Sequence, residues 1–280
     1  MKAKIIDGKA LASDIKKDIH KKAIEFENKH NRKIGLAVIL VGENPASQIY
    51  VRNKIVACEN TNIKSFEYYL PENTQENELI QLIEEINTDI NIDGLLVQLP
   101  LPSHLNEKYI LSKINPLKDV DGFHCLNAGN LFLGNDCLTA CTPSGIIELI
   151  KSTGESIEGK HAVVIGRSNI VGKPIAMLLL QNNATVTICH SRSEDIKSLT
   201  KQADILVVAI GKKEFVTADM IKDNSIIIDV GMNRVDGKLY GDVNFAQCSE
   251  KASYITPVPG GVGPMTITML LNNTVKAANR

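Results

Sequence analysis

The feature that most constrains this chain is an alternation of strand-like and helix-like segments, which occurs twice along the sequence. In the first half, strand-like segments at 34–41, 66–70 and 94–99 are separated by helical patterns at 10–28, 45–60 and 73–86. The run 34–41 is continuously apolar, which is typical of a parallel strand buried on both faces. This order predicts an α/β fold with a parallel sheet flanked by helices.

The second half repeats the alternation after a less periodic stretch, 100–138, and a helix predicted at 145–151. Strands are predicted at 162–165, 185–190, 205–210 and 226–229, with helices starting near 172, 194 and 217. Asp236-Gly237 predicts a hairpin turn, and a last helix is expected from about Met265. The pattern indicates a doubly wound, Rossmann-like sheet. With 280 residues, two domains are expected.

Charge and composition exclude several classes of protein. The formal net charge is -1, from 31 basic and 32 acidic residues, so nothing favours nucleic acid or an anionic membrane as partner. No apolar run is long enough to span a bilayer. Residues 1–11 carry charges throughout and lack the apolar core of a signal peptide. We therefore expect a cytoplasmic protein.

Six cysteines raise the question of a metal site. Cys137 and Cys141 form a Cys-x3-Cys pair, and His124 and His190 each adjoin a cysteine, but these spacings match no common zinc motif. We expect buried, reduced thiols and no metal.

The clearest motif is the turn Gly166-Arg167-Ser168-Asn169-Ile170-Val171-Gly172, which joins a predicted strand to a predicted helix. A helix N-terminus offers unpaired N–H groups to a pyrophosphate, and glycine lets the backbone approach the phosphates. Ser168 stands where a Gly-x-Gly-x-x-Gly motif has its middle glycine. A glycine-rich turn without a ligand is the alternative.

The end of the next strand bears on which dinucleotide would bind. An NAD site has an acidic residue there for the ribose hydroxyls, whereas this chain has His190-Ser191-Arg192. A hydroxyl and an arginine, with Arg167 nearby, would instead favour the 2′-phosphate of NADP. The alternative is that Arg192 simply lies in an exposed loop.

In the first half, Ser47, Tyr50 and Lys54 share one face of the predicted helix after Pro45. A tyrosine could stack on a ligand, and a lysine can act as acid or base, although most helix lysines are merely solvated. Gln98-Leu99-Pro100 ends the predicted strand 94–99, at the sheet edge where ligands bind in open α/β folds. Asp119 and Asp121 fit either turn chemistry or a site for a polar heterocycle.

Six motifs in this order resemble the bifunctional methylenetetrahydrofolate dehydrogenase/methenyltetrahydrofolate cyclohydrolase (FolD) family over essentially the whole chain. They are Tyr50-Val51-x-x-Lys54, Gln98-Leu99-Pro100-Leu101-Pro102, Lys118-Asp119-Val120-Asp121-Gly122, Thr142-Pro143-Ser144-Gly145, Gly166-Arg167-Ser168-x-x-Val171-Gly172-x-Pro174 and Pro257-x-Pro259-Gly260-Gly261-Val262-Gly263-Pro264-Met265-Thr266. The resemblance implies NADP-dependent oxidation of 5,10-methylenetetrahydrofolate, then hydrolysis to 10-formyltetrahydrofolate. It also implies a place in one-carbon metabolism, supplying purine, methionine and histidine biosynthesis.

The resemblance also implies roles for individual residues. Lys54 would be the central acid/base, Gln98 would tune it, Tyr50 would stack along the folate, and Asp121 would bind the pterin edge. Further substrate contacts would come from Val51, Leu99, Pro100, Gly260 and Gly261. Cofactor contacts would come from Thr142, Gly166, Arg167, Ser168, Ser191, Arg192 and Met232.

The family's organisation implies a folate-binding catalytic domain, residues 1–139 with 265–280, and an NADP-binding Rossmann-like domain, residues 140–264, with a cleft between them. It further implies a homodimer through the NADP-binding domain. Three alternatives stay open: a dehydrogenase without cyclohydrolase activity, a nucleotide-sensing protein without catalysis, and a dehydrogenase for another small substrate, since fold alone does not determine function.

Overall fold

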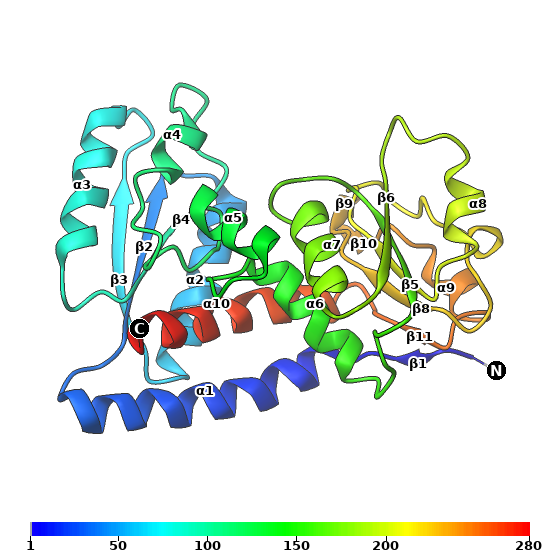
Figure 1. Ribbon diagram of the computed structural model, residues 1–280. Helices are drawn as coiled ribbons and strands as arrows, with labels where there is room; N and C mark the ends of the chain where they lie inside the picture. Colours follow the sequence, from blue (N-terminus) through cyan, green and yellow to red (C-terminus); the bar gives the residue numbers. More distant parts are fainter. Residues whose placement is uncertain (1) are drawn as a thin grey trace. The chain divides into compact units, whose positions relative to one another are not determined.

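The computed structural model describes residues 2–280, which divide into two compact units, each built around a parallel sheet (Figure 1). Unit 1 contains the residues up to Ser13 and Thr142–Thr266, and unit 2 contains Asp14–Cys141 and Ile267–Arg280. An α/β fold with two parallel sheets agrees with the class predicted from the sequence.

Unit 2 has a three-stranded parallel sheet in the order β3-β2-β4. Its strands are β2 (Gly35–Val41), β3 (Lys64–Leu70) and β4 (Gly94–Val97). Its helices are α1 (Gly8–His30, begun in unit 1), α2 (Pro45–Glu59), α3 (Glu76–Thr88), α4 (Glu107–Leu111), α5 (Cys125–Leu133) and the end of α10 (Val262–Ala278). The central strand β2 is buried at every position, because helices cover both faces of the sheet.

Local sequence explains how α2 reaches the end of β2. Gly42, with φ of 81°, lets the chain leave the strand. The Asn44 side chain then accepts hydrogen bonds from the backbone N–H groups of Ala46 and Ser47 at 3.0 and 3.2 Å. Pro45 occupies the first helical position, where its missing N–H costs nothing. Helix α2 is thereby anchored at the carboxyl edge of the sheet.

Unit 1 has a six-stranded parallel sheet in the order β1-β11-β8-β7-β5-β6. Its strands are β1 (Lys4–Ile5), β5 (His161–Ile165), β6 (Thr185–Cys189), β7 (Ile205–Val208), β8 (Ile226–Asp229) and β11 (Tyr254–Ile255), with a separate hairpin of β9 (Asn233–Val235) and β10 (Lys238–Tyr240). Its helical segments are α6 (Cys141–Lys151), α7 (Gly172–Gln181), α8 (Ile196–Thr200), η1 (Ala218–Met220) and α9 (Phe245–Cys248). The chain runs from β5 to β6 on one side and later to β7 on the other, so the carboxyl end of β5 is a switch point, where such sheets bind ligands.

The first residues of the chain belong to a different unit from the one that the sequence predicted. We expected residues 1–139 in one domain, but β1 pairs with β11, and the segment up to Ser13 therefore belongs to unit 1. Two residues of strand carry no readable periodicity, so only the tertiary pairing reveals this edge. At the other end, the division falls inside α10, after Thr266.

Several predicted boundaries shift for identifiable reasons. Helices α6 and α10 begin earlier than expected, since Pro143 and Pro264 lie in first turns, where no N–H is required. Helix α3 begins at Glu76, within the helical pattern predicted at 73–86, and Glu78 accepts from the Gln75 N–H at 3.0 Å. Helices α4 and α5 were missed within 100–138. The hairpin turn is confirmed, with φ of 49° at Asp236 and 76° at Gly237.

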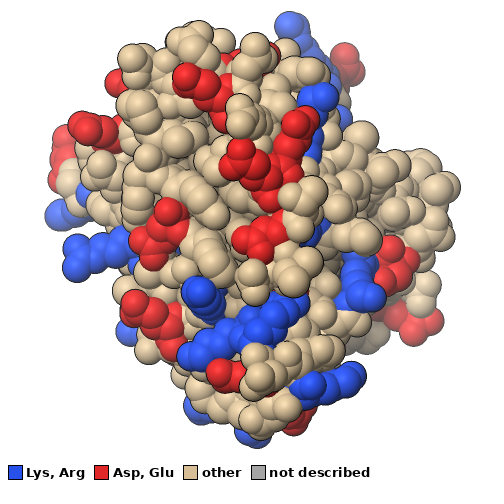
Figure 2. Space-filling view, turned by 90° about the vertical axis from the view of Figure 1, so that its left-hand side faces the viewer, with Lys and Arg blue, Asp and Glu red and all other residues tan. Residues whose placement is uncertain are grey.

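No helix within residues 2–280 is both long and apolar enough to cross a membrane. The face shown in Figure 2 carries basic and acidic side chains separated by larger uncharged areas. Among the same residues, no group of three His, Cys, Asp or Glu side chains is arranged to hold a metal ion. All six thiols are free, but Cys125 is exposed, so the expectation of buried cysteines was wrong at that position.

Candidate functional site

Helix α2 presents the predicted lysine in a buried setting. Lys54 is only 8% exposed, whereas Tyr50, one turn earlier, is 42% exposed. Val51 and Cys58 lie on the buried side of the same helix, which attaches α2 to the sheet. A lysine held out of water in this way has a restricted set of partners, unlike an ordinary solvated helix lysine.

The partner of Lys54 is Gln98, which follows β4. The Lys54 Nζ donates to Gln98 Oε1 at 3.0 Å, and Gln98 Nε2 donates to the Leu99 carbonyl at 2.6 Å. The second bond orients the amide so that its oxygen faces the lysine. Because the amide is neutral, it holds Lys54 without the strong preference for an ammonium ion that a carboxylate would impose.

An acidic residue, Asp121, lies close enough to Lys54 for their charges to interact. Burial raises the pKa of its carboxyl to about 6, and the charge of Lys54 opposes part of that rise. The Cys141 Sγ lies 4.0 Å from Asp121 Oδ1 and donates to the Val120 carbonyl at 3.2 Å. Burial raises the pKa of the Cys141 thiol, so it stays protonated.

The neighbouring carboxylate, Asp119, has a structural role. Its oxygens accept from the backbone N–H groups of Phe123 and His124, at 3.2 and 2.8 Å, and from Asn127 Nδ2 at 2.8 Å. The sequence left turn chemistry and ligand binding open for both aspartates. The structure assigns turn chemistry to Asp119 and leaves Asp121 beside the lysine.

In unit 1, the turn after β5 has the geometry of a phosphate-binding loop. Gly166 has φ of 132°, and a Cβ there would lie 2.4 Å from the Ala209 carbonyl oxygen. A Cβ on Gly172 would lie 2.3 Å from the Gly166 carbonyl oxygen. The Ser168 Oγ accepts from the N–H groups of Val171 and Gly172, at 3.1 and 3.3 Å, at the start of α7. Both glycines are thus required by close backbone approach.

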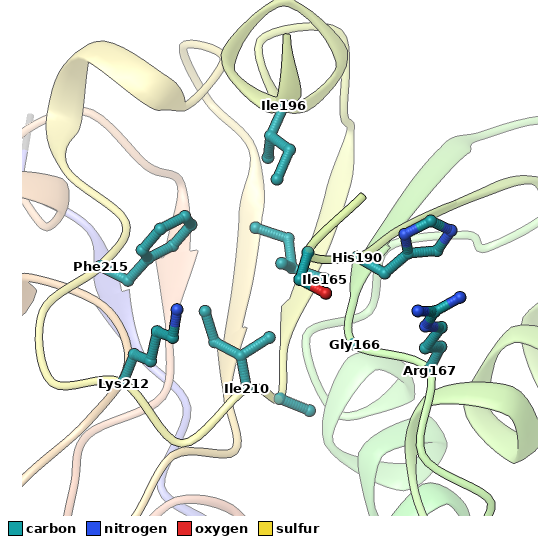
Figure 3. A pocket seen from close by; sticks show the side chains of 10 residues that line it. Ile165, Gly166, Arg167, His190, Ile196, Ile210, Lys212 and Phe215 are labelled. Atoms are coloured by element: carbon teal, nitrogen blue, oxygen red, sulfur yellow. The ribbon is translucent and has the colours of Figure 1, made fainter. Parts of the chain in front are cut away.

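A pocket of about 270 Å³ opens at the carboxyl ends of β5, β6 and β7 (Figure 3). Arg167 and His190 lie on one side of it, and Lys212 and Phe215 lie on the opposite side. The full lining is Ile165, Gly166, Arg167, His190, Ser191, Ile196, Ala209, Ile210, Lys212 and Phe215. The lining combines an apolar floor with basic and hydroxyl groups and includes no acidic side chain, which suits a phosphorylated nucleotide.

Some of the predicted cofactor residues line this pocket and others do not. Gly166, Arg167 and Ser191 line the pocket, whereas Thr142, Ser168, Arg192 and Met232 are described but lie outside its lining. Thr142 instead shares a hydrogen bond of 2.9 Å with Thr266, and Met232 is 49% exposed.

Among the predicted substrate residues, Val51 is buried in the core, and Gly260, with φ of 108°, accepts from the Lys9 N–H at 3.1 Å. Gly261 lies directly after it in the same loop of unit 1. Leu99 and Pro100 directly follow Gln98 in unit 2. The substrate contacts predicted for these residues stay predictions.

Sequence reasoning missed the far wall of the pocket. Ile210, Lys212 and Phe215 follow β7, and Ile196 begins α8. The signal in the sequence is their position after a predicted parallel strand, because open α/β sheets bind ligands beyond the carboxyl ends of their strands.

Two family models match the chain, one in its first half and one in its second half. The family model described as "Tetrahydrofolate dehydrogenase/cyclohydrolase, catalytic domain" matches residues 6–121. The model described as "Tetrahydrofolate dehydrogenase/cyclohydrolase, NAD(P)-binding domain" matches residues 140–280.

Individual relatives give the same result over the full length. The chain is 57% identical to "Bifunctional protein FolD" of Listeria innocua over 99% of this chain and 97% of that protein. A crystal structure of the bifunctional FolD enzyme from Campylobacter jejuni superposes with a TM-score of 0.97 at 50% identity, covering 99% of both chains. The Trypanosoma brucei enzyme, solved with NADP and an inhibitor, gives 0.95 at 38% identity, covering 100% of this chain and 98% of that one.

Both family models match the chain, and relatives of the same kind align with it from end to end at more than half identity. The chain therefore belongs to the tetrahydrofolate dehydrogenase/cyclohydrolase family, whose bifunctional members oxidise 5,10-methylenetetrahydrofolate and hydrolyse the product to 10-formyltetrahydrofolate.

Proposed function

We propose that the protein oxidises 5,10-methylenetetrahydrofolate with NADP+ and then hydrolyses the 5,10-methenyl cation to 10-formyltetrahydrofolate, with Lys54 as the acid/base of the hydrolytic step. The observation that carries this proposal is the buried Lys54 Nζ, held 3.0 Å from Gln98 Oε1 in a chain of this family. In the first reaction the methylene carbon loses a hydride. In the second, water adds to the resulting cation, one C–N bond breaks, and a proton is released.

Lys54 is suited to moving that proton. Its Nζ is buried and hydrogen-bonds a neutral amide, and a lysine positioned in this way can serve as a general acid/base. Gln98 acts as a positioning residue, because its own amide nitrogen is anchored on the Leu99 carbonyl. Tyr50, half exposed on the same helix, offers a ring against which the folate can stack.

Asp121 is proposed to bind the pterin. An ionised carboxylate accepts hydrogen bonds from the adjacent N–H groups of such a heterocycle in a bidentate manner. Its burial next to Lys54 gives it few competing water contacts. Val51, Leu99, Pro100, Gly260 and Gly261 are proposed to complete the substrate contacts.

NADP, which accepts the hydride when bound, is proposed to occupy the pocket at the end of β5. Two features of this chain fit it: Gly166 and Gly172 allow the tight turn between β5 and the start of α7, and the pocket lining is basic without a carboxylate. Arg167, Ser191 and neighbouring His190 would hold the 2′-phosphate. Ser168, Arg192, Thr142 and Met232 are proposed as contacts beyond the pocket itself.

A homodimer through unit 1 is also proposed. Strand β6 ends the six-stranded sheet, and its Ile188 is 36% exposed, so this edge has unpaired backbone groups and apolar surface available for a second copy. A cytoplasmic location would go with the nicotinamide and folate substrates.

The test follows two signals at once: NADPH formation from methylenetetrahydrofolate and decay of the methenyl absorbance. The native enzyme should show both, with higher kcat/KM for NADP+ than for NAD+. Lys54→Met should lose cyclohydrolase turnover by about a hundredfold or more, as expected for removal of a general acid/base. Arg52→Met, on the exposed side of the same helix, is the matched control and should retain both activities. Undiminished methenyl hydrolysis in Lys54→Met would refute the proposed role.

A further inference from the structure

Two carboxylates that no catalytic role accounts for are buried beside the cofactor pocket in unit 1. Asp229 is 3% exposed and Asp242 is 0% exposed. Asp229 ends β8, and its Oδ1 accepts from the backbone N–H groups of Gly231 and Asp242 at 2.9 and 2.8 Å. Burying two carboxylates so close together is costly unless each is fully hydrogen-bonded.

Asp242 has a full set of partners, and they are neutral. Its Oδ2 accepts from the backbone N–H groups of Ile210 and Gly211 at 2.8 and 2.9 Å. Its Oδ1 accepts from the Lys212 N–H and from Asn233 Nδ2, both at 2.8 Å. One side chain therefore ties together two segments that are far apart in the sequence.

Both segments bear on the cofactor. Ile210 and Lys212 form the pocket wall opposite Arg167 (Figure 3). Asn233 begins β9, directly after Met232, which the family resemblance assigns to the cofactor. The segment 210–212 lies in no helix or strand, and the Asp242 carboxylate accepts from all three of its backbone N–H groups.

The two carboxylates are closely packed against glycine backbone. A Cβ at Gly231 would lie 2.2 Å from Asp242 Oδ1, and a Cβ at Gly241 would lie 1.8 Å from Asp229 Oδ2. Because Gly231 and Gly241 have no side chains, the two carboxylates can occupy the space beside them. A carboxylate with four donors in a closed site has one geometry available, which is what a positioning group requires.

We propose that Asp242 is a positioning residue for cofactor binding: its carboxylate shapes the 210–212 wall of the NADP pocket and couples that wall to the segment carrying Met232. The inference rests on the proposed use of this pocket by NADP. An asparagine cannot replace the carboxylate, because its amide NH2 would face two donors on one side.

The test compares Asp242→Asn with the native enzyme in the dehydrogenase and cyclohydrolase assays. Leaving buried donors unpaired should raise KM for NADP+ about tenfold, and the dissociation constant for NADP+ likewise, with a smaller change in kcat. Hydrolysis of supplied methenyltetrahydrofolate consumes no nicotinamide cofactor, so its rate should stay near native. Circular dichroism and the thermal midpoint report on whether unit 1 is folded.

Two further variants separate positioning from stability alone. Asp204→Asn is the matched control: Asp204 accepts from the His161 N–H at 2.9 Å, at the opposite, amino-terminal edge of the same sheet. It should lower stability without raising KM for NADP+. The exchange Asp242→Asn with Asn233→Asp restores a donor–acceptor pair between these side chains and should recover part of the affinity.

The outcomes distinguish this inference from the function on which it rests. If the native enzyme reduced no NADP+, the proposed function would fail. If the native enzyme were active and Asp242→Asn lost stability with KM for NADP+ unchanged, or lost no more affinity than Asp204→Asn, Asp242 would be a purely structural residue and the inference would be overturned.

Discussion

At the scale of single residues, Asp121 shows how burial and a neighbouring charge determine what a side chain can do. Its pKa is raised to about 6 by burial, while the positive charge of Lys54 lowers it. Its neighbour Asp119 accepts three hydrogen bonds and serves the turn. Two aspartates separated by one residue thus have different roles, because three donors within the turn already bind the Asp119 carboxylate.

The raised pKa of Asp121 predicts an acid limb in substrate binding. Protonation begins at a higher pH than for an ordinary carboxyl, and the protonated form is a poorer acceptor, so KM for methylenetetrahydrofolate should rise as pH falls through about 6. In Lys54→Met the charge that lowers this pKa is gone, so the midpoint for tetrahydrofolate binding, measured by equilibrium dialysis, should move to higher pH. An unchanged midpoint would contradict electrostatic coupling between the two residues.

At the scale of elements, α10 supports the segment that carries Asp121. Asn273, 4% exposed, donates through Nδ2 to the carbonyls of Val120 and Thr139, both at 2.8 Å. The same nitrogen lies 3.7 Å from the Cys141 Sγ. A helix from the end of the chain therefore fixes two loop segments next to the proposed pterin site.

Removing that support should affect both stability and substrate affinity. Asn273→Ala removes the amide donor shared by the Val120 and Thr139 carbonyls, which should lower the free energy of unfolding by about 1–3 kcal/mol and raise KM for the folate more than KM for NADP+. Asn279→Ala, directly after α10, is the control, since its Nδ2 donates to the Val275 carbonyl of the adjoining helical turn. Urea unfolding and steady-state kinetics measure the two effects. Equal changes in both KM values would argue against a local role.

At the scale of the whole molecule, the first residues of the chain lie inside unit 1, against segments that follow residue 250. Strand β1 pairs with β11, and the Lys9 N–H donates to the Gly260 carbonyl at 3.1 Å. The proposed substrate loop at 257–261 is therefore held by the first residues of the chain. A Cβ at Gly8 would lie 1.9 Å from the Gly261 carbonyl oxygen, so only glycine fits at this contact.

Gly8→Ala should consequently distort the 257–261 loop. We expect a loss of about 1–3 kcal/mol in unfolding free energy from overpacking, and a clear fall in dehydrogenase kcat/KM. Gly129→Ala is a matched glycine change within a helix, at a position where an added Cβ meets no atom within 4 Å, and it should be neutral or stabilising. Thermal denaturation of both variants measures the difference. Native stability in Gly8→Ala would contradict the packing argument.

The sequence by itself determined the features that depend on local chemistry. Apolar runs specify β2 and β5, Asn44-Pro45 specifies the start of α2, and Asp236-Gly237 specifies the hairpin, because periodicity, capping and turn conformation involve only neighbouring residues. The spacing of Tyr50 and Lys54 and the motif order likewise sufficed to identify the family.

Only the tertiary structure decided which distant residues meet. The pairing of β1 with β11 and the contact of Asp242 with 210–212 join segments that no local pattern relates. The different environments of Asp119 and Asp121 likewise arise only in the folded chain. The physical reason is that burial and hydrogen-bond saturation are properties of a packed environment, so a side chain's role becomes defined when its partners reach it.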